Sequence, residues 1–251
     1  MLPLAVGGAQ ASVPLDSASL RRLTAHTDSL YFAFRPDSAL ALCERAFASG
    51  VDDAGLRWRA ARAGIALGML QPDRAARIAW YEHALGHARR ALALAPEDRE
   101  ISYWVAAAAG RRVDRDDPVL STKLGREVFE RASGILAADS NHAGAHHALG
   151  SVHAEVLRLP AFLRFIAGHV LRVNIMKYAS LVEADRHLRR AVELDPQMIV
   201  YAADLANFLG RTGHTAEANA LARRLITLPR VHPMDDRVRA AVVKKWLLVS
   251  P

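Results

Sequence analysis

The feature that most constrains this chain is a segment that occurs twice and ends both times in proline. Residues 87–96 read HARRALALAP and residues 187–196 read HLRRAVELDP, with His, an Arg pair and Ala at matching positions. Proline stops a helix, because its ring removes the N–H donor and restricts the residue before it. The recurrence therefore indicates a repeat array, in which each unit packs mainly against its neighbours.

The small and apolar residues before each proline resemble the second helix of a tetratricopeptide repeat. Ala184, Leu188, Ala191 and Pro196 fit that pattern best. Other second helices are indicated by Ala39 and Ala46, by Ala84, Ala91 and Pro96, and by Ala218 and Leu225. Two departures are evident, since the aromatic motif positions are mostly Ala or His and several links between paired helices are long. The resemblance implies an all-α fold, a right-handed superhelix of antiparallel helix pairs.

Composition agrees with this fold class. Ala, Leu and Arg are frequent and rank among the best helix formers, while alternating runs rich in Val, Ile and Thr are missing. Asp16, Asp37 and Asp53 are expected N-caps. The second helices of two pairs are expected to extend backwards, to residues 74 and 119. The predicted helices are 16–33, 37–49, 53–69, 74–95, 98–111, 119–138, 142–158, 161–172, 180–194, 197–211, 215–227 and 234–248.

One apolar insert interrupts the array at residues 159–178. His153 precedes Ala184 by 31 positions, whereas the corresponding residues of the repeat family are nine apart, and connections between packed helices usually run about 2–8 residues. Three interpretations stay open. The insert is a helix that caps the core, a lid or wall of an apolar pocket, or a helix in a membrane interface. The candidate ligand-binding residues in it are Phe162, Phe165, Ile166, His169 and Tyr178.

The order of these elements is similar to the regulator of microtubule dynamics family and its bacterial relatives. A His-rich stretch with Leu149 and Gly150 precedes the apolar insert, and Lys177 to Ser180 then lead into the next repeat helix. The likeness is clearest over 75–190. In that family some members are associated with microtubules, and one with organelle contact sites and lipid binding. We carry over the architecture and an apolar ligand as an alternative, without the microtubule role.

Histidines gather in the same region. His142 and His146 are four residues apart, and His153 follows one heptad after His146, so a helix would place all three on one side. Two imidazoles at this spacing can chelate a metal, but the zinc-peptidase pattern is missing, because Ala143 follows His142. Since His146 and His153 also occupy packing positions of the repeat, we predict no metal and no cofactor. Both remain candidate ligand-binding residues.

The chain carries a formal net charge of +7, much of it from Arg. The Arg pairs could meet phosphates, but few aromatic residues stand beside them to stack on bases, so no nucleic-acid partner is predicted. No nucleophile elbow, Walker loop or dinucleotide fingerprint occurs. We therefore expect a non-enzyme, a scaffold that binds a protein or peptide on its concave face. The alternative is a carrier of a lipid or other apolar molecule that uses residues 159–178 as its lid.

Residues 1–15 stand apart from the array. They read as the remnant of a secretory signal, with Ala9, Gln10 and Ala11 as a small-residue cleavage site, or as a disordered tail. The first interpretation implies export, for example to a periplasm, with Ser12 as the mature N-terminus, and the second is compatible with a cytoplasmic protein. A single helical-repeat domain is expected over 16–251.

Overall fold

A computed structural model describes residues 16–114, 116–159 and 179–247. Within these ranges the regular structure is entirely helical. The helices are α1 (Ser17–Phe32), α2 (Pro36–Ala48), α3 (Ala54–Leu70), α4 (Arg74–Leu94), α5 (Arg99–Arg112), α6 (Pro118–Ala138), α7 (Ala143–Val156), α10 (Leu181–Leu194), α11 (Ile199–Arg211), α12 (Thr215–Leu225) and α13 (Asp235–Val242), which a π-helical turn, η2 (Val243–Leu247), continues. These bounds confirm the predicted all-α fold and the backward extension of α4 and α6.

Aspartates are the N-caps of five of these helices, α1, α3, α4, α5 and α6. The Asp16 carboxylate accepts a hydrogen bond from the Ser19 amide at 2.6 Å, and that of Asp53 accepts one from the Leu56 amide at 2.8 Å, as predicted. The prediction that Asp37 is an N-cap is wrong. Helix α2 begins at Pro36, with Arg35 as its N-cap, because a proline suits the first helical position, where its missing donor has no helical partner anyway. Asp37 lies in the first turn instead.

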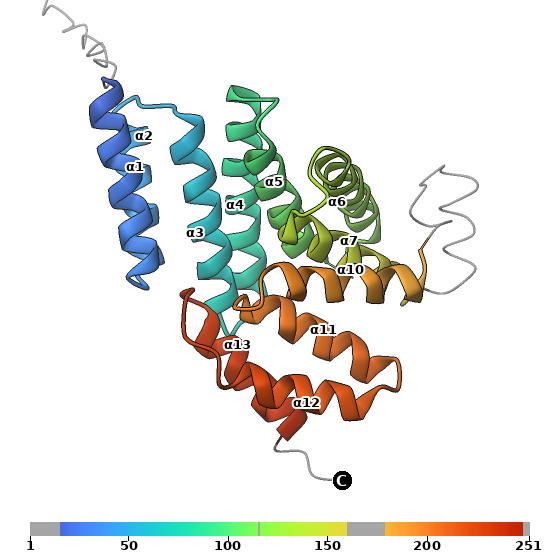
Figure 1. Ribbon diagram of the computed structural model, residues 1–251. Coiled ribbons are helices and arrows are strands. Elements are labelled where there is room, and N and C mark those ends of the chain that lie inside the picture. The colour runs from blue at the N-terminus through green and yellow to red at the C-terminus, as the bar shows by residue number, and fades with distance from the viewer. Residues whose placement is uncertain (1–15, 115, 160–178, 248–251) are drawn as a thin grey trace, which may run out of the picture.

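Neighbouring helices form antiparallel pairs, α1 with α2, α3 with α4, α5 with α6, α7 with α10, and α11 with α12 (Figure 1). Small residues permit their close approach. A Cβ added at Gly64 would lie 3.1 Å from the Cβ of Ala84, and Ala60, Ala84 and Ala91 are completely buried. The helices therefore cross where side chains are short, as the repeat pattern predicts.

The two ends of the array meet. Val200 and Met234 are buried in the same hydrophobic cluster as Tyr31 and Leu40 of the first pair. Arg237 of α13 also donates a hydrogen bond, at 2.9 Å, to the backbone carbonyl of Gln71, which follows α3. Figure 1 shows the orange and red C-terminal helices turned back beneath α3. The inner side is therefore partly filled by the chain itself, which was not predicted from the sequence.

None of the helices in the described ranges is both long and apolar enough to cross a membrane. The predictions for residues 1–15 and for the insert, apart from Leu159, lie outside the described residues.

Candidate functional site

The first helices of successive pairs carry a connected set of ring side chains, which we call the aromatic row. Its members come from α1, α3, α5, α7 and α11. They are Tyr31, Phe32, Trp58, Tyr103, Trp104, His142, His147 and Tyr201. In a superhelix of helix pairs the first helices face inward, so the row marks the inner face of the array.

The centre of the row is a pair of parallel indole rings. Trp58 of α3 stacks on Trp104 of α5, with ring centroids 5.8 Å apart and an interplanar angle of 9°. The Arg62 guanidinium lies 5.2 Å from the Trp58 ring and 4.1 Å from that of Tyr31. Both tryptophans are only partly buried. This stretch is thus a partly accessible aromatic pair with two cations beside it, since the Arg59 guanidinium also lies 4.2 Å from the Trp58 ring.

Beyond the tryptophans the row crosses to the last complete pair. The ring centroids of Tyr103 and His142 are 5.0 Å apart. The Tyr103 hydroxyl lies 3.4 Å from the Tyr201 hydroxyl on α11. His147 stacks on Tyr201, with centroids 4.5 Å apart. The tyrosine hydroxyls therefore link α5 directly to α11 across the inner side.

Carboxylates neutralise the cations along this face. Asp28 accepts hydrogen bonds from Arg59 and Arg62, at 2.8 and 2.6 Å. Burial opposes the charge on Asp28, but the two guanidiniums outweigh it and lower the pKa of this carboxyl. Farther along the face, Asp204 Oδ2 accepts a hydrogen bond from His147 Nε2 at 2.8 Å. The Arg62 Nε is buried without a partner among the described residues.

The predicted site residues His146 and His153 face α10, the second helix of their own pair. His146 Nδ1 lies 2.7 Å from His187 Nδ1, and His146 Nε2 lies 3.0 Å from the Ser140 carbonyl oxygen. His153 Nδ1 accepts a hydrogen bond from the Ser180 amide at 3.3 Å. Burial lowers the pKa of all three imidazoles, that of His187 to about 4. These neutral rings hold α7 and α10 together.

His142 does not share a helical face with His146. It is the N-cap of α7, outside the helical turns, and its Nδ1 accepts a hydrogen bond from the Ala145 amide at 3.1 Å. The i,i+4 argument therefore does not apply to this pair.

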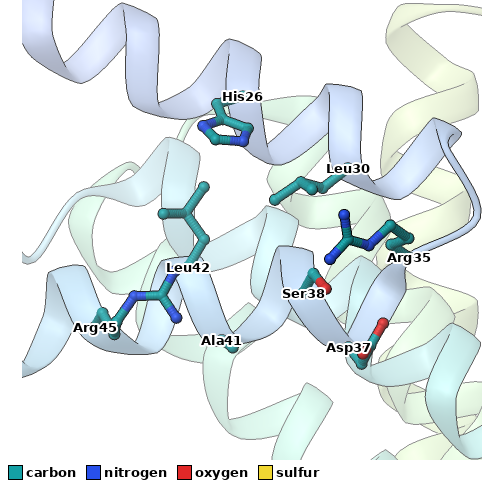
Figure 2. A pocket seen from close by; sticks show the side chains of 8 residues that line it. All are labelled: His26, Leu30, Arg35, Asp37, Ser38, Ala41, Leu42 and Arg45. Atoms are coloured by element: carbon teal, nitrogen blue, oxygen red, sulfur yellow. The ribbon is translucent and has the colours of Figure 1, made fainter.

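A shallow depression of about 400 Å³ lies between α1 and α2 (Figure 2). Leu30 and Leu42 supply its apolar part, while His26, Asp37 and two arginines surround them. The complete lining is His26, Leu30, Arg35, Asp37, Ser38, Ala41, Leu42 and Arg45. None of the predicted site residues is among them. The remaining predicted residues, Phe162, Phe165, Ile166, His169 and Tyr178, lie outside the described residues.

The paired helices and their inner aromatic row define an all-α helical-repeat protein of the tetratricopeptide type. The family model "Regulator of microtubule dynamics protein 1-3" matches residues 23–248. The chain therefore belongs to the regulator of microtubule dynamics family, as its sequence resemblance predicted. No curated protein sequence matches the chain.

Similarity to solved structures supports the fold. The chain is similar to TTC0263, a thermophilic tetratricopeptide-repeat protein of Thermus thermophilus, with 18% identity and a TM-score of 0.60 over 91% of this chain and 99% of that one. It is also similar to MamA of Desulfovibrio magneticus RS-1, with 18% identity and a TM-score of 0.46 over 86% and 97% of the two chains. The first likeness, at such low identity, shows the fold alone, and the second is too distant to add to it.

The aromatic row was not predicted, although the sequence contains one signal for it. Trp58, Tyr103 and His147 each stand five positions after the N-cap of their helix, namely Asp53, Asp98 and His142. Aligning the predicted first helices by their caps, rather than by the repeat motif, would have placed these rings together.

Proposed function

We propose that this protein is a non-catalytic scaffold that binds a segment of a partner protein on the aromatic row. The observation that carries the proposal is the stacked, partly accessible Trp58–Trp104 pair with Arg62 beside it. Aromatic residues and arginine are enriched at protein interfaces and supply much of their binding energy. The partner segment would place apolar side chains on the accessible parts of the indoles.

The chemistry of the row supports binding rather than catalysis. His147 is hydrogen-bonded to Asp204, but no hydroxyl or thiol nucleophile is bonded to its ring among the described residues. The only cysteine, Cys43, is buried, and burial raises the pKa of its thiol to about 11. A thiol of this kind is not a nucleophile at neutral pH.

Site-specific photo-crosslinking in the native host tests the proposal. A photoreactive phenylalanine analogue at Trp104 should give a discrete crosslinked protein, whereas the same analogue at Lys123, exposed on α6, should not. Adding Trp58→Ala should reduce the crosslinked yield about tenfold or more, as expected for an interface residue of central importance. The same products from both positions, or none from Trp104, would contradict the proposal.

A second function, binding of an apolar ligand, is favoured by the residues that flank the insert. Leu181 and Val182 are 53% and 73% exposed, and Leu159 is 38% exposed. Exposed apolar side chains at both ends of residues 160–178 suit a lid over an acyl chain or a membrane contact. Native mass spectrometry of gently purified protein should then show a bound lipid, and its repeated absence would count against this function.

Export remains part of the proposal. If residues 1–11 are removed during secretion, sequencing of the mature protein should begin at Ser12, whereas a retained Met1 would contradict export.

A further inference from the structure

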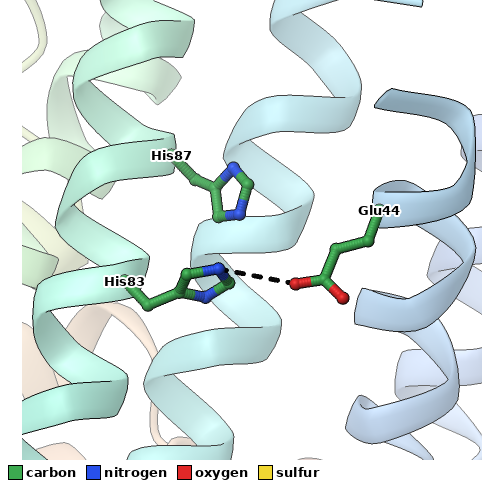
Figure 3. A group of neighbouring side chains, drawn as sticks. All are labelled: Glu44, His83 and His87. Carbon is green, nitrogen blue, oxygen red and sulfur yellow. Dashed lines mark ion pairs between the residues drawn. The ribbon is translucent and has the colours of Figure 1, made fainter. Parts of the chain in front are cut away.

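A second group of side chains lies away from the aromatic row, between α2 and α4. His83 and His87 are four residues apart on α4, so their side chains project from the same face. Glu44 reaches them from α2. One ligand atom from each of the three residues lies within 4.8 Å of the other two. In Figure 3 the two imidazoles and the carboxylate point toward one another.

We propose that Glu44, His83 and His87 form a binding site for a divalent zinc-like metal ion. Two imidazoles and one carboxylate are a donor set that binds zinc and leaves a fourth position open. Zinc–ligand bonds of about 2.0–2.1 Å place tetrahedral donors roughly 3.4 Å apart. His83 Nε2 and Glu44 Oε1 are already 3.4 Å apart. The third donor, from His87, lies within 4.8 Å of the other two.

His87 has an unused nitrogen for this purpose. The residue is 9% exposed, and its Nε2 is buried without a hydrogen-bond partner. An unpaired polar atom at a buried position is costly and calls for an explanation, which a bound ion would supply.

The surroundings leave room for exchange of the ion. The side chains of His83 and Glu44 are 42% and 48% exposed, so solvent reaches the open position. On the other side, the Phe47 ring lies 5.3 Å from that of His87 and shields it. The site thus combines one buried ligand with two accessible ones.

The present hydrogen bond between Arg57 and His87 is incompatible with zinc binding. The Arg57 Nη1 lies 3.3 Å from His87 Nδ1, and a guanidinium can only donate hydrogen bonds. When zinc takes Nε2, the proton must sit on Nδ1, so Arg57 has to turn away. In its present position Arg57 also contacts Asp52 at 2.8 Å and the Phe47 ring at 3.7 Å.

Zinc titration by calorimetry, with the purified full-length chain freed of metal, tests the proposal. We expect one saturable zinc per chain and a loss of affinity of at least about tenfold in His83→Gln and Glu44→Gln, since even outer-shell partners commonly contribute that much. Both residues are exposed, so the variants should fold, which circular dichroism can check. His26→Gln, an exposed histidine on α1, is the matched control and should bind as the parent does.

Three outcomes overturn the site: no saturable binding, binding that survives both substitutions, or an equal loss in the His26 control. Arg57→Gln supplies an independent arm, because its carbonyl can accept the Nδ1 proton. Zinc affinity should rise up to about tenfold in this variant. Unchanged or weaker binding would contradict coordination through His87 Nε2.

Discussion

At the scale of single residues, the contact between His146 and His187 defines a chain of donors and acceptors. Arg186 Nη2 lies 3.1 Å from His187 Nε2, and since arginine only donates, this nitrogen accepts. His187 Nδ1 then carries the proton and donates to His146 Nδ1 at 2.7 Å, while His146 Nε2 donates to the Ser140 carbonyl. The chain is complete only when both rings are neutral. A proton added to His146 Nδ1 has no acceptor, and one added to His187 Nε2 must displace Arg186 and has only Glu183, 3.7 Å away, as a counter-charge.

This chain predicts a loss of stability in mild acid. Burial lowers the folded-state pKa of His187 to about 4 from an ordinary value of 6.5, so between these values the unfolded state binds more protons. The free energy of unfolding should therefore fall by about 1–2 kcal/mol from His187 as the pH drops from about 7 to 5. Urea titrations of His187→Gln should show a smaller dependence on pH than the parent. In His214→Gln, a substitution at an exposed position, the free energy of unfolding should depend on pH as it does in the parent. If the pH dependence is unaltered in His187→Gln, the prediction is wrong.

Single residues also show what the sequence could predict. Asp16 and Asp53 could be recognised as caps, since capping depends on neighbours within three positions. The metal ligands could be recognised only in part. His83 and His87 carry the i,i+4 spacing in the sequence, but Glu44 meets them only through side-chain contacts between α2 and α4, for which no local pattern exists. The same spacing at 142 and 146 was misleading, because residue 142 is a cap and lies outside the helix that carries residue 146.

At the scale of helices, the space around each glycine shows whether a side chain could fit there. Some glycines permit two helices to pack closely, and others lie where an added methyl group would meet nothing. A methyl group on Gly150 of α7 would lie 2.7 Å from Leu188 Cγ and 2.9 Å from the Leu188 backbone nitrogen of α10. A methyl group on Gly134, exposed on α6, would meet no atom within 4 Å. The repeat motif includes Gly150 and not Gly134.

Substitution by alanine should therefore have opposite effects at the two positions. Gly150→Ala should lower the free energy of unfolding by about 1–3 kcal/mol, because α7 and α10 must separate. Gly134→Ala should raise it by about 0.5–1 kcal/mol through helix propensity. Thermal or urea unfolding measures both. If both substitutions change the free energy of unfolding equally, the close approach of α7 and α10 is not the reason for glycine at position 150.

Helix existence was predictable to within a few residues, because capping, proline stops and small-residue periodicity are local. The partners of each helix followed from the repeat resemblance. The packing of α11 and α13 against the first pair could not be predicted in this way, because it depends on the curvature of the whole superhelix.

At the scale of the whole molecule, the contact between the two ends makes a specific prediction. Met234 is 9% exposed and packs in the cluster that contains Tyr31 and Leu40. Met234→Ala should lower the opening free energy of amides in α1 and α2 by about 2 kcal/mol. Hydrogen exchange measured by mass spectrometry should then accelerate in these helices, although they lie far from residue 234 in the sequence.

The control for this experiment is Ile226→Ala, since Ile226 is 37% exposed after α12. It should leave exchange in α1 and α2 unchanged. If Met234→Ala accelerates exchange only within α11 to α13, the ends do not support each other in solution.

The meeting of the two ends also affects how the chain folds. An open array of repeats is quasi-one-dimensional, frays from its ends and needs only contacts between neighbours. Here Val200, Met234 and Arg237 contact residues near the start of the chain, which raises the contact order. Folding must therefore close a large loop at some stage, so we expect slower folding than in an open array of equal length, and a single unfolding transition instead of gradual melting from the termini.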